Sequence, residues 1–261
     1  MKFRLIFIGL IVLFSNYLFA QDRKTIFYPG EEIEYRVSFM GINLGTIKIT
    51  SKDYVDYNGK NIPSAVAEMR SAPGIPFVDL HAFFESWFST GINYSEKFNS
   101  KVKQSENSWK YEYYNVDNNK KQVIYEQYLD KDLLVKTEHK FDNRVLDGLA
   151  LFFFARQFTD IKRTVKVPTL MNNSISNTNL NFHGKKESAK INAVDYPIRC
   201  LYFDGRADWE GIYGLKGYFQ GWFSDDDARV PIRALMNVYV GNIDIQLVKW
   251  KRGDWQPPRA K

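Results

Sequence analysis

Hydrophobic and polar residues alternate along the first part of the chain. In residues 31–39 an apolar side chain stands at every second position, and Tyr35 belongs to this apolar set. A period of two is typical of a β-strand with one buried face. The alternation resumes at residues 46–50, after a short segment with Gly41 and Gly45 at its ends. The two segments predict a β-hairpin.

Further strand-like segments, separated by turn-forming residues, continue along the chain. They span residues 62–70, several stretches within 77–128 that include 109–116 and 121–128, and then 163–170, 180–185, 190–203, 217–224, 232–240 and 243–250. The polar run at residues 172–179 predicts a loop. About a dozen strands without a regular repeat favour a mainly β fold, either a single antiparallel curved sheet or a barrel-like closed sheet.

One segment, residues 147–158, lacks the period of two. It opens with Asp147, a good helix-capping residue, and it is apolar almost all round until Arg156. The run is too short to cross a membrane. It predicts one short helix buried against the sheet.

The N-terminal residues have the three parts of a secretory signal peptide. Lys2 and Arg4 precede an apolar run at residues 5–14, and the small residue Ala20 stands before the polar Gln21. The apolar run is shorter than the roughly 20 residues that cross a bilayer, so a retained anchor is the weaker interpretation. We expect cleavage after Ala20 and no transmembrane span in the mature chain.

These features set the expected boundaries and compartment. Residues 1–20 are assigned to the signal peptide, 21–252 to one antiparallel β domain and 253–261 to a flexible tail. The mature chain is expected in the periplasm or outside the cell. No lipid anchor is expected, because the only cysteine, Cys200, lies far from the apolar run. We expect Cys200 to be a buried free thiol.

Composition favours a large core and argues against nucleic-acid binding. Aromatic residues make up 16% of the chain, which favours strands and supplies large side chains for burial. The net charge of +6 includes the two cations of the signal peptide, and the other lysines and arginines are scattered among 30 acidic residues. Because nucleic-acid binding needs a concentrated basic face, we expect none.

The chain shows no firm pattern for a metal, a cofactor or a catalytic group. The aspartates of residues 225–227 form the densest acidic cluster, but the pattern of a calcium loop is missing and a turn between strands is favoured. The three histidines lack the spacing of zinc ligands, and no serine-nucleophile motif occurs. Asp79 and Glu85, near Trp87, could imitate a glycosidase carboxylate pair. An envelope hydrolase or glycan-processing enzyme therefore stays an alternative.

Three segments carry a resemblance to a known family. They are residues 30–45 with Gly30, Glu31 and Tyr35, residues 147–156 from Asp147 to Arg156, and residues 222–243. Their order and spacing resemble the bacterial envelope family called domain of unknown function 3108. The resemblance implies an exported, envelope-associated β domain and supplies no catalytic residues, because that family has no established activity. Its general form is similar to carrier-like half-barrels that hold an acyl chain on the concave side of a sheet.

Three side chains are candidate ligand-binding residues. Arg156 ends the apolar helix, where it could anchor an anionic head group, or could pair with a carboxylate such as Asp147. Tyr35 and Trp222 are expected to face the helix from the surrounding sheet. The leading hypothesis is a non-enzymatic domain that binds a lipid, another hydrophobic or amphipathic envelope component, or a protein partner. A structural assembly component is a third interpretation.

Overall fold

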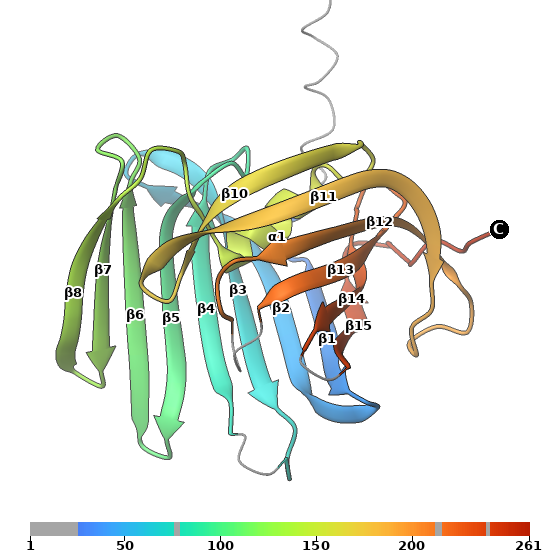
Figure 1. The fold of residues 1–261 in the computed structure, drawn as a ribbon, viewed down its shortest axis with the longest axis horizontal. Helices are drawn as coiled ribbons and strands as arrows, with labels where there is room; N and C mark the ends of the chain where they lie inside the picture. Colours follow the sequence, from blue (N-terminus) through green and yellow to red (C-terminus); the bar gives the residue numbers. More distant parts are fainter. Residues whose placement is uncertain (1–25, 76–78, 212–215, 239–240) are drawn as a thin grey trace, which may run out of the picture.

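One curved sheet dominates the computed structural model, which describes residues 26–75, 79–211, 216–238 and 241–261 (Figure 1). The predicted signal peptide lies outside the described residues. The sheet has 15 strands in the described part of the chain. They are Glu32–Phe39 (β1), Ile42–Tyr57 (β2), Lys60–Ser71 (β3), His81–Phe88 (β4), Ser95–Ser105 (β5), Ser108–Asp117 (β6), Gln122–Leu129 (β7), Asp132–Lys140 (β8), Leu146–Asp147 (β9), Arg163–Met171 (β10), Ser174–Ala189 (β11), Ile198–Ala207 (β12), Gly217–Ser224 (β13), Pro231–Asn237 (β14) and Asn242–Lys251 (β15).

The sheet consists of two meanders joined in its middle. Strands β1 to β8 pair in sequence order, as do β10 to β15, and β1 pairs with β15 to join the two halves. Every pairing is antiparallel except that of the short β9 with β10. The sheet curls round on itself without closing, since β8 and β9 stay at its two ends. The prediction of a mainly β fold with a single antiparallel curved sheet is confirmed.

The predicted buried helix is present as α1, Gly148–Arg156, and lies inside the curve of the sheet (Figure 1). Asp147 caps its N-terminus by accepting hydrogen bonds from the backbone N–H groups of Leu149 and Ala150. Phe153 is fully buried, with its ring 5.7 Å from that of Phe27 and 5.4 Å from that of Phe88. The helix is therefore the centre of the core.

The polar run that predicts a loop at residues 172–179 is mostly strand. Asn172 and Asn173 alone form the turn, both with positive φ, and β11 begins at Ser174. Thr178 is fully buried because β11 pairs with both β10 and β12, so its polar backbone and side chain find partners within the sheet. The predicted strand at residues 190–203 is also shorter in the structure, beginning only at Ile198 after Pro197.

The expectation of a flexible tail at residues 253–261 is wrong. The backbone N–H of Arg199 donates to the carbonyl of Pro258, and the N–H of Ala260 donates to the carbonyl of Pro197. The Trp255 ring packs against the core, 6.1 Å from that of Trp250. These contacts hold the segment beside β12.

Candidate functional site

The concave side of the sheet beyond α1 carries apolar side chains that stay partly open to solvent. They pack against the buried core on one side and remain partly exposed to solvent. They come from β2, β4, α1, β13 and β15: Ile47, Phe84, Phe152, Phe219 and Ile245. Because side chains alternate between the two faces of a strand, they share one face with the core. This set is called the concave lining below.

Two glycines allow aromatic rings to lie close to the sheet on this side. A Cβ atom at Gly205 would collide with the ring of Phe219, and one at Gly221 with the ring of Phe203. Each ring therefore lies over bare backbone and not above another side chain. The glycines therefore allow both rings to lie close to the backbone of the sheet.

A polar group borders the concave lining on β5, β6 and β7. The Glu112 carboxylate accepts from the Ser100 hydroxyl at 2.7 Å and from the Tyr125 hydroxyl at 3.0 Å, and Lys110 Nζ lies 3.3 Å from it. Ser100 pairs in register with Phe84 of the lining. Apolar and polar groups thus meet on one face.

A buried charge cluster fixes the C-terminal end of α1. Arg156 is fully buried and makes a bidentate pair with Glu31, at 2.8 and 3.0 Å, and donates to the carbonyl of Ala228 at 2.8 Å. Arg252 donates to the same Glu31 carboxylate at 2.7 Å. The cluster links the start of β1, the end of α1, the β13–β14 connection and the end of β15.

Burial and charge act on the pKa of Glu31 in opposite directions. Burial alone would raise it, but the adjacent guanidinium groups of Arg156 and Arg252 hold the pKa below its ordinary value. The carboxylate is therefore ionised at neutral pH. Arg156 pairs with Glu31 and not with Asp147, which lies at the other end of the helix with Ser86 and Ser95 as donors at 2.6 Å.

The structure brings Tyr35 and Arg156 together but places Trp222 elsewhere. The Tyr35 hydroxyl donates to the carbonyl of Pro231, its ring lies edge-on to Phe152 at 6.4 Å, and burial raises its pKa well above the ordinary value. Trp222 follows strand alternation and points away from the side of its buried neighbour Phe223.

On that outer side, Trp222 donates to Glu187 at 2.7 Å and its ring lies 5.6 Å from that of Tyr202. The expectation that Trp222 faces the helix is therefore wrong.

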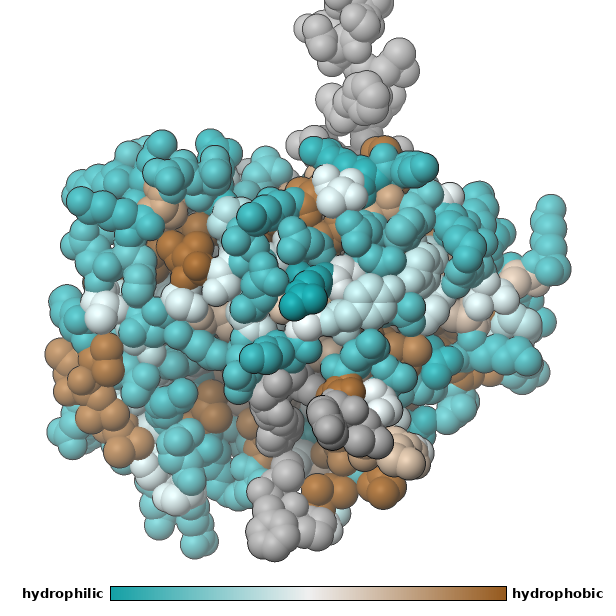
Figure 2. All heavy atoms as spheres, viewed as in Figure 1, coloured by the Kyte–Doolittle hydropathy of each residue, from teal (hydrophilic) through white to brown (hydrophobic). Residues whose placement is uncertain are grey.

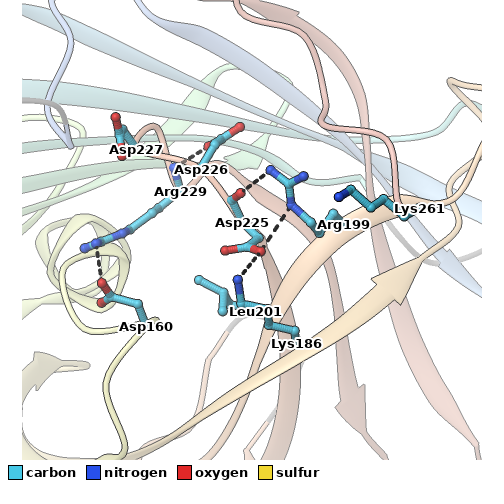
Figure 3. A pocket seen from close by; sticks show the side chains of 9 residues that line it. All are labelled: Asp160, Lys186, Arg199, Leu201, Asp225, Asp226, Asp227, Arg229 and Lys261. Atoms are coloured by element: carbon cyan, nitrogen blue, oxygen red, sulfur yellow. Dashed lines mark hydrogen bonds and ion pairs between the residues drawn. The ribbon is translucent and has the colours of Figure 1, made fainter.

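The aspartates of residues 225–227 line an open cleft of about 540 Å³ beside the charge cluster (Figure 3). Its other lining residues are Asp160, Lys186, Arg199, Leu201, Arg229 and Lys261. Asp225 pairs with Lys186 and Arg199 at 3.0 and 3.1 Å, and Arg229 pairs with Asp160 at 2.8 Å. Opposite charges are balanced within the cleft.

Asp226 acts as a turn residue. Its carboxylate accepts from the Ser224 hydroxyl, from the backbone N–H groups of Ala228 and Arg229, and from the Trp255 indole N–H. The structure thus agrees with the turn predicted for this segment. In the part of the chain that the structure describes, no group of three or more histidine, cysteine, aspartate or glutamate side chains could hold a metal ion.

The other residues considered for chemistry do not assemble. Asp79 is largely exposed and pairs with Lys103 at 2.8 Å, and among the described residues no contact joins it to Glu85. The histidines have separate partners: His81 contacts Glu68, His139 contacts Asn173 and His183 contacts Asp204.

The sequence pattern indicates that the Glu31 side chain is buried. It stands in phase with Ile33 and Tyr35 in the alternating segment, which places its carboxylate on the buried face. A charge at a buried position calls for a partner of opposite charge. Arg252 had no comparable signal, since it lies in a polar stretch at the chain end.

Comparison with known structures supports the fold. A β-barrel-like protein of the domain of unknown function DUF1849 from Brucella abortus matches with a TM-score of 0.56 and 8% identity, over 88% of this chain and 100% of that chain. A protein from Bacteroides fragilis, provisionally described as exported and with a YmcC-like fold, matches with a TM-score of 0.38 and 11% identity, over 87% and 99% of the two chains. The second score is too low to carry an argument.

A search of curated proteins finds no match. Within the described residues, no helix has the length and apolar character needed to cross a membrane. The family described as "Protein of unknown function (DUF3108)" matches residues 34–248, which include β1, α1 and the β13–β14 connection. The chain therefore belongs to the DUF3108 family.

Proposed function

We propose that this chain is an exported, non-catalytic binding domain that holds an amphipathic envelope molecule on the concave side of its sheet. The observation that carries the proposal is the concave lining, in which five apolar side chains from β2, β4, α1, β13 and β15 remain partly exposed. Apolar side chains that gather in a hollow without being covered mark a site for an apolar group.

The neighbouring polar group explains why the ligand is amphipathic. Lys110 and Glu112 stand on the same face of the sheet as the lining, with the Lys110 side chain partly exposed. An acyl chain would lie against Phe84, Ile47 and Ile245, while its polar end would reach Lys110. Each CH₂ removed from water contributes about 0.8 kcal/mol, so a chain of ordinary length binds without a charged anchor.

Arg156 has a supporting role in this proposal. Its guanidinium group is paired with Glu31 and it is fully buried, so it positions α1 under the lining. Tyr35 contributes through its contact with Phe152. An enzymatic function has less support, since Asp79 and Glu85 do not meet.

The test is lipid retention by the processed chain. The protein, recovered after export, is examined by native mass spectrometry and then titrated with cis-parinaric acid, a fluorescent fatty acid. We expect a bound acyl species and saturable parinarate binding. The Ile245→Trp variant, which fills the concave side, should bind parinarate at least tenfold more weakly.

Ile161→Trp is the matched control, because Ile161 is an exposed apolar residue outside the sheet. It should bind as the unmodified chain does. The proposal is refuted if the processed chain neither retains an acyl species nor binds parinarate, or if the two variants bind equally.

A further inference from the structure

The outer face of β4 to β7 carries aromatic side chains that the core does not use. On β6 they stand at alternate positions, Trp109, Tyr111 and Tyr113, all partly exposed, whereas their neighbour Tyr114 points inward and is buried. Rings two residues apart on a strand stand about 7 Å from each other. The three rings therefore form a row, which suits an extended chain better than a compact ligand.

A groove of about 420 Å³ lies at one end of this row. Tyr111, Tyr113 and Tyr128 line it, with Glu126, Asp130 and Lys131. The ring of Tyr128 is edge-on to that of Tyr113 at 5.8 Å. Within the described residues, the hydroxyl groups of Tyr111 and Tyr113 have no hydrogen-bond partner, and Lys131 has no ion pair.

One acidic side chain of the groove is paired with a lysine, and the other accepts hydrogen bonds from neutral donors. Glu126 pairs with Lys136 at 2.7 Å and accepts from the Tyr128 hydroxyl. Asp130 accepts from the Ser108 hydroxyl and from the backbone N–H of Trp109. The charge of Glu126 is therefore balanced by Lys136, whereas Asp130 keeps its negative charge and lines the groove together with Lys131.

Two further cations stand among the rings. Lys97 lies over the Trp87 ring at 4.9 Å, and Lys101 lies 4.2 Å from the centroid of Trp109 and 5.7 Å from that of Tyr111. No salt bridge joins either lysine to a carboxylate in the described part of the chain. Between them on β5, Asn99 has a buried side-chain oxygen without a hydrogen-bond partner. Lys97 also interacts electrostatically with Glu85, whereas Lys101 lies over two rings and can turn toward an anionic ligand.

We propose that this outer face binds an acidic glycan chain laid along β6. The C–H faces of sugar rings pack against Trp109, Tyr111 and Tyr113, because those faces are apolar and the aromatic rings offer a matching surface. Sugar hydroxyls pair with the free phenol groups. The acidic groups of the glycan pair with Lys101 and Lys131, which stand beside the row and make no salt bridge among the described residues.

This site is independent of the concave site, since the two lie on opposite faces of the sheet. The test titrates the processed full chain with a hexamer of galacturonic acid, followed by calorimetry, and compares a neutral cellulose hexamer. We expect saturable binding of the acidic hexamer. Tyr113→Ala should weaken it at least tenfold, and Lys101→Gln should weaken it several-fold while leaving weak binding of the neutral hexamer unchanged.

Tyr218→Ala is the matched control, because Tyr218 is an exposed tyrosine on β13, remote in the sheet order from β6. Melting temperatures of all variants establish that they fold. Absence of binding, or equal binding by Tyr113→Ala and Tyr218→Ala, overturns the proposal. Equal affinity for polyglutamate or for a thymidine oligonucleotide also overturns it, because it would show a site for any polyanion.

Discussion

Replacing Glu31 with glutamine tests whether the buried charge cluster holds the fold together. Glu31 is 1% exposed and accepts three charge-assisted hydrogen bonds, two from Arg156 and one from Arg252. Glutamine keeps the shape but removes the negative charge to which Arg156 and Arg252 both donate, and turns an amide N–H toward one of the two buried guanidinium groups. Removing one partner of a buried ion pair costs about 3 to 5 kcal/mol.

That cost should be visible in the melting temperature. In a chain of this size each kcal/mol lowers the melting temperature by roughly 2 to 4 °C, so Glu31→Gln should lower it by roughly 6 to 20 °C. Denaturant titration of the same variant gives the free energy of unfolding directly. The control is Glu34→Gln, which removes a pair with the exposed Lys249 and should cost less than about 1 kcal/mol.

The pH dependence gives a second measurement of the same cluster. The guanidinium groups hold the pKa of Glu31 below the ordinary 4.5, so the unfolded chain takes up the proton first as the pH falls. The stabilisation by Glu31 is complete above pH 4.5 and is lost as the pH falls through the lower pKa of the folded state. The stability difference between the unmodified chain and Glu31→Gln should therefore shrink in acid.

The reasoning would be refuted by a cost below about 1 kcal/mol at pH 7, since that is the range of exposed pairs. A difference that does not shrink in acid would also contradict it. Burial raises the pKa of Asp147, which has the opposite effect on acid stability, but Asp147 is present in both proteins and cancels in the comparison.

Three further predictions concern the core, the thiol and the N-terminus. Phe153→Ala should cost about 3 to 5 kcal/mol in the free energy of unfolding, because it empties a fully buried site between Phe27 and Phe88; an unchanged denaturation midpoint would contradict the packing of α1 in the core. Burial raises the pKa of Cys200 to about 12, so a thiol reagent should label it slowly in the native chain and fast in denaturant; equal rates would contradict its burial. Mass analysis of exported protein should find Gln21 at the N-terminus, and recovery of intact chain only in membranes would contradict cleavage.

Local patterns were enough to predict most of the strands and the helix. Alternation located β1 and its hairpin partner β2, and the capping Asp147 with an apolar run located α1. The arrangement of the sheet was not predictable in the same way. The pairing of Glu32 with Lys251 joins β1 to β15 from opposite ends of the chain, and a period of two does not say which strands become neighbours.

The candidate site was predicted only in part, for a related reason. Arg156 stood out as a charge at the end of an apolar helix, but its partner depends on where β1 lies relative to α1. The sequence pattern does not show which face Trp222 occupies, because an aromatic residue flanked by Gly221 and Phe223 has no local signal for which side is covered. The burial of Arg252 depends on docking of the C-terminal segment through Trp255, which follows from tertiary contacts alone.

The two ends of α1 explain why the concave lining is a preformed surface. Asp147 is tied to Ser86 and Ser95 of the sheet at one end, and Arg156 is tied to Glu31 at the other. Both networks are buried, so lifting the helix as a lid would expose two sets of unpaired polar groups at once. The helix therefore stays fixed, and the proposed ligand would meet Phe152 and the sheet in the positions they already hold. Binding of this kind involves little rearrangement of the protein, which favours affinity for an apolar chain even without a dedicated anchor for its head group.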